Sequence, residues 1–150
     1  MGARVNIKTD FEPFLKELEK AGKNVDKYAD RNINTVAGIF EENLKAECQK
    51  SGEPSDVIKD ISREDIKRGN YRACKVGWKI TEPYNARKIS TAFKAIFMNY
   101  GTIERYTQLK RFRGSIKARG FINRAKRKTN KDIEKQQEKL ISDIMGDLKQ

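Results

Sequence analysis

The chain has 150 residues, with 33 Lys and Arg against 21 Asp and Glu and no histidine, so its formal net charge is +12 at pH 7. This length favours a single domain, residues 1–150, because one hydrophobic core keeps growing up to about 250 residues. The absence of histidine removes the usual base of serine and cysteine nucleophiles, imidazole zinc ligands and the side chain that switches charge near neutral pH. The two cysteines, Cys48 and Cys74, form no Cys-x-x-Cys motif, and we expect free thiols in a reducing compartment.

The N-terminus lacks the apolar stretch of a signal peptide, and no run approaches the roughly 18 apolar residues of a membrane span. Asn6 stands where a myristoylation signal requires Ser or Thr. We therefore expect a cytoplasmic protein with no membrane partner. Residues 1–10, which precede the first helical stripe, are expected to be a flexible N-terminus.

The first half of the chain has the periodicity of a long helix. Its apolar residues lie mostly three, four or seven positions apart, at Phe11, Leu15, Leu18, Val25, Ala29, Ile33, Val36, Phe40 and Leu44. Asp10 is a suitable N-cap, and Gly22 either divides the stripe into two helices or lies within one gently kinked helix. Ser51, Gly52 and Pro54 end the stripe.

The middle of the chain predicts a helical turn or two followed by a small sheet. Residues 57–61 contain the apolar positions of the short helix. Residues 72–80 alternate with the period of a half-buried strand, on which Trp78 is predicted to be a core anchor. Residues 91–100 are predicted to be a second strand with apolar side chains on both faces.

Residues 103–118 are predicted to be a basic loop or hairpin, with Gly114 as the turn candidate. From Arg119 a helical stripe returns, formed by Phe121, Ile122, Ala125, Ile133, Leu140, Ile141, Ile144 and Leu148. Long N-terminal helix, small antiparallel sheet and long C-terminal helix together predict an α+β fold with the C-terminal helix on one face of the sheet. Such a long helix exceeds what one small sheet buries, so we expect part of it to lean on a neighbouring subunit.

Most of the net charge lies in one stretch, residues 105–131, which we call the basic segment. It holds eleven basic residues and no acidic one, whereas the rest of the chain has 22 basic residues against 21 acidic ones. Its cations are Arg105, Lys110, Arg111, Arg113, Lys117, Arg119, Arg124, Lys126, Arg127, Lys128 and Lys131. A solvated basic face is one interpretation. The interleaved Tyr106, Leu109, Phe112, Ile116 and Phe121 favour a surface that meets phosphate, bases or another protein chain.

No motif points to catalysis. Neither glycine-rich phosphate motif, Gly-x-x-x-x-Gly-Lys-Ser/Thr or Gly-x-Gly-x-x-Gly, occurs in the chain. The acidic clusters alternate with basic residues as solvated helical faces do; they are Glu17 and Glu19, Glu41 and Glu42, and Asp60 with Glu64 and Asp65. We therefore predict a protein that is not an enzyme, with no catalytic residue, cofactor, metal or small-molecule substrate. A carboxylate-dependent nuclease is the enzyme class left open.

Three short motifs, in this order, resemble the sequence pattern of tailed-phage head-tail joining proteins, the small neck or tail-completion proteins of lambda-type siphophages and prophages. The motifs are Val76-Gly77-Trp78, Asn99-Tyr100-Gly101-Thr102 and Ala118-Arg119-Gly120-Phe121-Ile122-Asn123-Arg124-Ala125. The resemblance covers the chain from about Phe11 to Leu148. The chain departs from the pattern at Pro54-Ser55-Asp56-Val57-Ile58-Lys59, which lacks the family's Thr-Gly turn, at Asn99 in place of Glu, and at Gly120 in place of Pro.

The resemblance implies a non-enzymatic virion protein that assembles, as a ring, between the portal-side connector and the tail tube. Its partners would be copies of itself and the adjacent connector and tail proteins, in the virion and, during assembly, in the host cytoplasm. The motif residues Val76, Gly77, Trp78, Tyr100, Gly101, Thr102, Phe121, Ile122 and Ala125 would hold the fold. The basic segment would face genomic DNA or a neighbouring ring. The alternative is a small basic nucleic-acid-binding module of host or mobile-element origin.

Overall fold

The computed structural model describes residue 16 and residues 25–68, 71–79 and 89–148. The predicted flexible N-terminus, the Asp10 cap and the choice between one and two helices at Gly22 lie outside the described residues. So do Phe11 and the other apolar positions that precede residue 16 in the first stripe.

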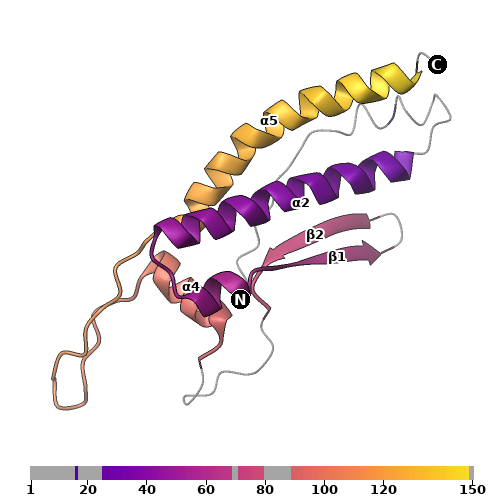
Figure 1. Cartoon of the computed structure of the whole chain (residues 1–150). Helices are drawn as coiled ribbons and strands as arrows, with labels where there is room; N and C mark the ends of the chain where they lie inside the picture. The colour runs from indigo at the N-terminus through magenta and orange to yellow at the C-terminus, as the bar shows by residue number, and fades with distance from the viewer. Residues whose placement is uncertain (1–15, 17–24, 69–70, 80–88, 149–150) are drawn as a thin grey trace.

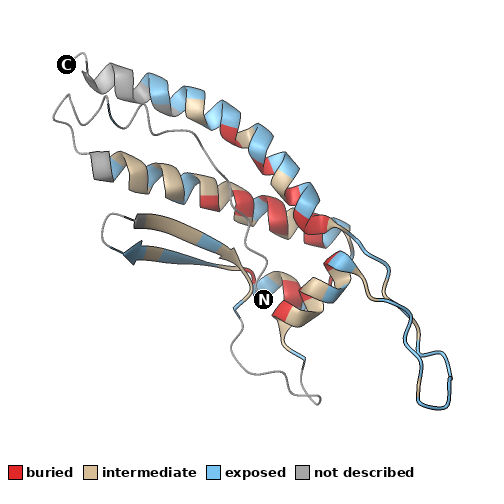
Figure 2. Ribbon diagram, turned by 180° about the vertical axis from the view of Figure 1, so that it is seen from behind, coloured by how far each residue is buried: buried red, intermediate tan, exposed pale blue. Residues whose placement is uncertain are grey.

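Two long helices lie side by side and form the body of the molecule (Figure 1). Helix α2 spans Val25–Lys50 and helix α5 spans Phe121–Leu148. The end of α2 and the start of α5 agree with the predicted bounds. On α2, Phe40, Leu44 and Cys48 are buried at intervals of four residues, which keeps them on one face of the helix. Figure 2 shows that buried residues gather where α2, α4 and the first turns of α5 meet.

The sheet of the described chain has two antiparallel strands, β1 (Ser62–Arg68) and β2 (Tyr71–Gly77). Both contact α2, and α5 lies on the opposite side of α2 from the strands (Figure 1). The predicted α+β class is therefore confirmed, with both long helices on one side of the sheet. Helix α5 forms a second layer on α2, so much of its apolar stripe is covered within the same chain.

Ion pairs tie the sheet to α2. The Nη1 atom of Arg72 on β2 lies 2.6 Å from Oδ2 of Asp30, and Nζ of Lys67 on β1 lies 3.4 Å from the same oxygen. The hydrogen bond from Arg72 holds the pKa of Asp30 below its usual value. Further along α2, Nε of Arg63 lies 2.7 Å from Oε2 of Glu41. These contacts fix the sheet against one side of the helix.

Residues 91–100, predicted to be a strand, form helix α4 (Thr91–Tyr100) instead. The hydroxyl of Ser90 caps this helix by accepting a hydrogen bond from a backbone N–H of the first turn. Its buried residues, Ala92, Ala95 and Asn99, are three and four positions apart, as one helical face requires. The prediction was wrong because seven of the ten residues in the run are apolar or aromatic, so apolar positions fit the strand period as well as the helical one.

The partner of β2 is β1, a segment whose acidic residues predict a solvated helical face. The strand sequence SREDIKR has Ile66 as its one apolar residue, so no alternation marks it. Glu64 and Asp65 therefore lie on a strand, with their side chains on opposite faces, and not on one helical face. The dipeptide Gly69-Asn70 between the strands is a hairpin signal that could have revealed β1. The predicted short helix is present as α3 (Ser55–Lys59).

Both cysteines are free thiols. Burial, with the nearby carboxylates of Glu53 and Glu47, raises the pKa of Cys48 to about 12. Burial, with a hydrogen bond to Asp65, raises the pKa of Cys74 to about 11.

Because the thiolate is the reactive form, we expect a thiol reagent at about pH 8 to modify Cys48 only when the chain unfolds. The folded chain also holds this proton more tightly than the unfolded chain, so the contribution of Cys48 to stability is lost as the pH rises from 9.0 towards about 12. The rate at which a thiol reagent modifies each cysteine, measured with and without denaturant, tests this expectation. Rapid modification of Cys48 in the native chain would contradict its buried position.

Candidate functional site

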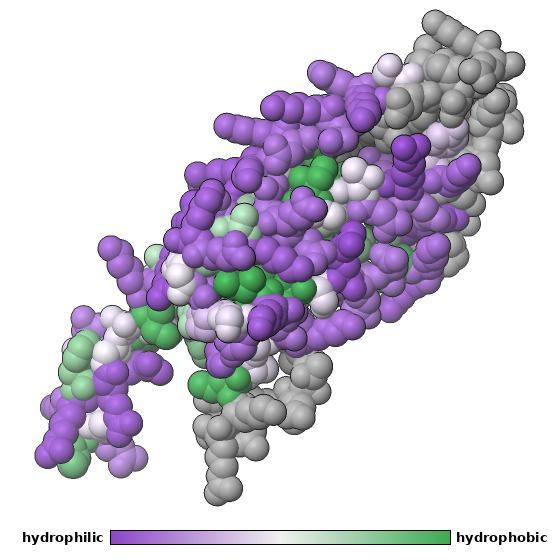
Figure 3. All heavy atoms as spheres, viewed as in Figure 1, coloured by the Kyte–Doolittle hydropathy of each residue, from purple (hydrophilic) through white to green (hydrophobic). Residues whose placement is uncertain are grey.

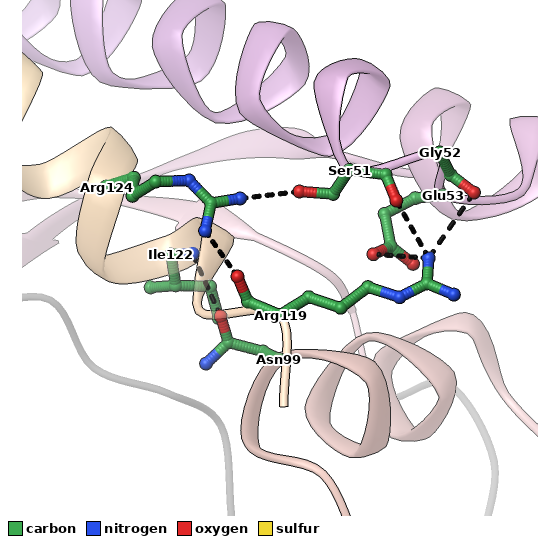
Figure 4. Close-up of polar contacts among 7 residues, drawn as sticks. All are labelled: Ser51, Gly52, Glu53, Asn99, Arg119, Ile122 and Arg124. Atoms are coloured by element: carbon green, nitrogen blue, oxygen red, sulfur yellow. Dashed lines mark hydrogen bonds and ion pairs between the residues drawn. The ribbon is translucent and has the colours of Figure 1, made fainter. Parts of the chain in front are cut away.

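The basic hairpin leaves the body at a corner between the end of α4 and the start of α5. The backbone N–H of Arg119 donates to the carbonyl of Met98 at 3.0 Å, and that of Gly120 donates to the carbonyl of Asn99 at 3.0 Å. The buried Asn99 Oδ1 accepts a hydrogen bond from the backbone N–H of Ile122 at 2.9 Å (Figure 4). Asn99 therefore satisfies one of the unpaired N–H groups in the first turn of α5.

Two further residues of the Asn99-Tyr100-Gly101-Thr102 motif shape the base of the hairpin. Gly101 has φ 77° and ψ −178°, a conformation that essentially only glycine adopts. Thr102 donates its backbone N–H to the carbonyl of Ile116 at 2.9 Å and accepts the N–H of Ile116 on Oγ1 at 2.9 Å. Tyr100, in contrast, is exposed. The Gly-Thr pair thus joins the two ends of the hairpin where it meets the body.

The other motif residues lie in or against the core beside this corner. Trp78 follows β2, is half-buried, and donates its Nε1 hydrogen to the carbonyl of Val57 at 2.6 Å. Its ring meets the buried ring of Phe121 edge to face, with centroids 6.3 Å apart. Ile122 and Ala125 are buried, and Val76 packs on the same core. Trp78 is therefore the core anchor that the sequence predicts, and it connects the end of the sheet to the start of α5.

Residues 103–118, which we call the arm, form a two-legged hairpin that projects away from the body (Figure 1). The legs are joined by hydrogen bonds from Arg113 N to Arg105 O at 2.7 Å and from Thr107 N to Arg111 O at 2.9 Å. Tyr106 and Phe112 form a β-bridge between these two pairs. Of the two predicted forms, loop or hairpin, the structure has the hairpin.

The turn of the hairpin lies at residues 107–111 and not at Gly114. The N–H of Lys110 donates to the carbonyl of Thr107 at 2.8 Å, and Lys110 has φ 55°. A tight turn followed by one left-handed residue is the usual three-residue hairpin loop. Gly114 lies in the returning leg, where its φ of 86° allows the backbone to bend.

Large apolar side chains on the arm are exposed to solvent. The exposed fractions are 86% for Ile103, 78% for Leu109, 61% for Phe112 and 58% for Tyr106. Figure 3 shows hydrophobic residues interspersed with hydrophilic ones along the arm, well away from the body. The rings of Tyr106 and Phe112 lie 5.6 Å apart and contact each other across the legs. The Tyr106 hydroxyl donates to Oε2 of Glu104 at 2.8 Å, which raises the pKa of Tyr106.

The structure divides the cations of the basic segment into three groups. Five lie on the arm: Arg105, Lys110, Arg111, Arg113 and Lys117. Two lie at the corner, namely Arg119 and, in the first turn of α5, Arg124. Four lie further along α5: Lys126, Arg127, Lys128 and Lys131. On α5, Arg127, Lys128 and Lys131 are exposed, and Lys131 lies four residues after Arg127 and three after Lys128, which places the three on one side of the helix. The eleven cations therefore do not form one continuous surface.

Both corner arginines form hydrogen bonds with groups of the same chain (Figure 4). Nη1 of Arg119 donates to the carbonyls of Ser51 and Gly52 at 2.9 and 3.4 Å and to Oε1 of Glu53 at 3.1 Å. Nε of Arg124 donates to Oε2 of Glu47 at 2.9 Å, and this bond lowers the pKa of Glu47. These two arginines satisfy the C-terminal end of α2 and its nearby carboxylates, so we leave them out of the candidate interface.

The described residues contain no group of three or more Asp, Glu or Cys side chains arranged to hold a metal ion. None of the helices in the described ranges is long and apolar enough to cross a membrane. An open hollow of about 670 Å³ lies beside α2 and β1. Of its two lining carboxylates, Glu41 and Asp65, Glu41 is paired with Lys45 and Arg63.

No protein-family model, curated protein or solved structure matches this chain. A function must therefore be argued from the arm, from the corner that holds it and from the resemblance carried by the three motifs.

Proposed function

We propose that this chain is a non-enzymatic structural protein of a tailed phage or prophage, which assembles as a ring at the head-tail junction as a neck or tail-completion protein. The observation that carries the proposal is the arm, which presents four largely exposed apolar side chains away from the body. Exposed apolar clusters with polar surroundings mark surfaces that bind other proteins. The apolar side chains of the arm fit a second copy of the chain or an adjacent connector or tail protein.

The position of the arm links it to the three motifs that resemble the head-tail joining family. Gly101 and Thr102 form its base, and Phe121 begins the helix to which it returns. Variation in these residues would change where the arm points as well as how the core packs. The resemblance and the exposed arm therefore support the same proposal, a protein built to present this hairpin to its neighbours in a virion.

In this proposal the protein has no small-molecule substrate, cofactor or membrane partner, and it is located in the host cytoplasm during assembly and in the virion afterwards. The basic segment faces genomic DNA or a neighbouring ring. The alternative function, a small nucleic-acid-binding module of host or mobile-element origin, requires the monomer to bind nucleic acid tightly without assembling.

We expect the purified chain to self-associate as its concentration rises, and we expect the doubly substituted variant Ile103→Ser, Leu109→Ser to remain monomeric. Both side chains are more than three-quarters exposed, so the substitutions remove apolar contacts with partners and leave the core intact. Sedimentation velocity over a concentration series measures the association, and negative-stain electron microscopy identifies rings.

The matched control is Ile89→Ser, Ile141→Ser, which removes two exposed apolar side chains away from the arm. It should assemble like the unaltered chain. A chain that stays monomeric at every concentration, or arm and control variants with equal effects, would contradict the proposed assembly.

A further inference from the structure

The pairing of the arm's two legs sorts its side chains onto two faces. The bridge between Tyr106 and Phe112 places Arg105 opposite Arg113 and Thr107 opposite Arg111, and one backbone hydrogen bond joins each of these pairs. The N–H of Arg105 donates to the next residue, Gly114. Paired residues share a face and successive residues alternate, so Arg105, Arg111 and Arg113 lie on one face. We call this set the arginine face. The bridged pair Tyr106 and Phe112 lies on the other face.

The three guanidinium groups of the arginine face have no hydrogen bond or ion pair to any residue in the described ranges. Arg105 and Arg113 are directly opposite each other, an arrangement in which like charges repel across the ribbon. The single acidic residue of the arm, Glu104, is held on the other face by the hydroxyl of Tyr106. An external anion between the two arginines would relieve the repulsion.

We infer that the arginine face binds the phosphate backbone of duplex DNA. Guanidinium groups pair with phosphate oxygens through two hydrogen bonds at once, and several closely spaced arginines suit a ligand with regularly repeated phosphates. A two-stranded ribbon fits the major groove of B-form DNA, about 12 Å wide, whereas the major groove of double-stranded RNA is too narrow for side chains to enter. Contacts to phosphates carry no sequence information, so binding is independent of sequence.

This inference rests on the proposed function for the source of the DNA, which is the genome that passes through the junction. It assigns separate tasks to two kinds of side chain on the hairpin. The exposed apolar side chains contact protein, and the guanidinium groups of the arginine face contact the duplex. Arg119 and Arg124 take no part, because their guanidinium groups are held by Glu53 and Glu47.

The test compares two triple variants that lose the same charge. One is Arg105→Gln, Arg111→Gln, Arg113→Gln on the arm, and the other is Arg127→Gln, Lys128→Gln, Lys131→Gln on α5. The ligand is a random-sequence DNA duplex, titrated over a series of salt concentrations. We expect the arm variant to bind at least about tenfold more weakly and its plot of log affinity against log salt to be shallower by about 3, at about 0.9 per lost phosphate contact. The α5 variant should retain the slope of the unaltered chain.

Three results would overturn the inference: no binding of the duplex by the unaltered chain, equal losses in the two triple variants, or equal binding of a double-stranded RNA of the same sequence. Sedimentation of the same variants separates this inference from the proposed function, since the arm variant keeps its apolar residues. Assembly without DNA binding rejects the arginine face as a DNA site and leaves the ring intact. DNA binding by a chain that never assembles rejects the ring and favours the nucleic-acid-binding module.

Discussion

Replacement of Arg119 by Gln is expected to lower the free energy of unfolding by about 3 kcal/mol, because the carboxylate of Glu53 then stays buried without a cation. The side chain of Glu53 is 0% exposed, and its Oε1 lies 3.1 Å from Nη1 of Arg119. Removal of one partner from a buried ion pair costs about 3 to 5 kcal/mol. We expect the lower value because the Arg119 side chain is 40% exposed and solvent already screens part of the interaction.

Urea unfolding of three variants and their parent measures this effect. Arg113→Gln makes the same chemical change at an exposed arginine with no partner in the described chain, so we expect it to change stability by less than about 0.5 kcal/mol. Glu53→Gln combined with Arg119→Gln removes the uncompensated charge and should recover part of the loss. Equal stabilities of Arg119→Gln and Arg113→Gln would show that the buried pair contributes nothing.

Arg119 shows why the sequence locates the basic segment but does not predict that its cations fall into separate groups. In the sequence, Arg119 and Arg124 continue a run of cations with no acidic neighbour. In the structure their carboxylate partners, Glu53 and Glu47, lie 66 and 77 positions earlier in the chain. The sequence shows where positive charge is locally in excess. Which of these cations pair with distant carboxylates depends on how α2 and α5 pack. Within the basic segment, the arm and the exposed face of α5 are the places where the structure keeps cations together without a carboxylate partner.

The parts of the fold that the sequence predicts are those with a strong local signal. Helix α2 follows from apolar residues at helical spacing, and β2 follows from alternation up to Gly77. The arm is predicted as a basic loop or hairpin, but its turn is misplaced at Gly114, because the turn at residues 107–111 contains no glycine. In contrast, the mostly apolar sequence of α4 fits both the helical and the strand period, so its Ser90 cap and terminal Gly101 identify it as a helix. Strand β1 carries almost only charged residues and becomes a strand because β2 and α2 lie beside it.

The corner where the arm begins is expected to be the position most sensitive to a small change. Substitution of Gly101 by Ala should lower the free energy of unfolding by more than about 3 kcal/mol. Its φ of 77° with ψ of −178° is a conformation that costs other residues about 1 to 3 kcal/mol. A Cβ atom would also lie 2.7 Å from the carbonyl oxygen of Ile116 and 2.8 Å from the backbone nitrogen of Ala118. Both are backbone atoms, so relief requires the returning leg of the arm to move.

Gly114→Ala is the matched control for this prediction, because Gly114 also has a positive φ, 86°, yet nothing lies within 4 Å of the position its Cβ would take. It should cost only the conformational penalty of about 1 to 2 kcal/mol. Thermal and urea unfolding compare the two variants. Because movement at Gly101 breaks the contacts of Thr102 with Ile116, Gly101→Ala should also weaken self-association and duplex binding, whereas Gly114→Ala should change them little. Equal stabilities of the two alanine variants would show that the crowding at Gly101 does not hold the arm in place.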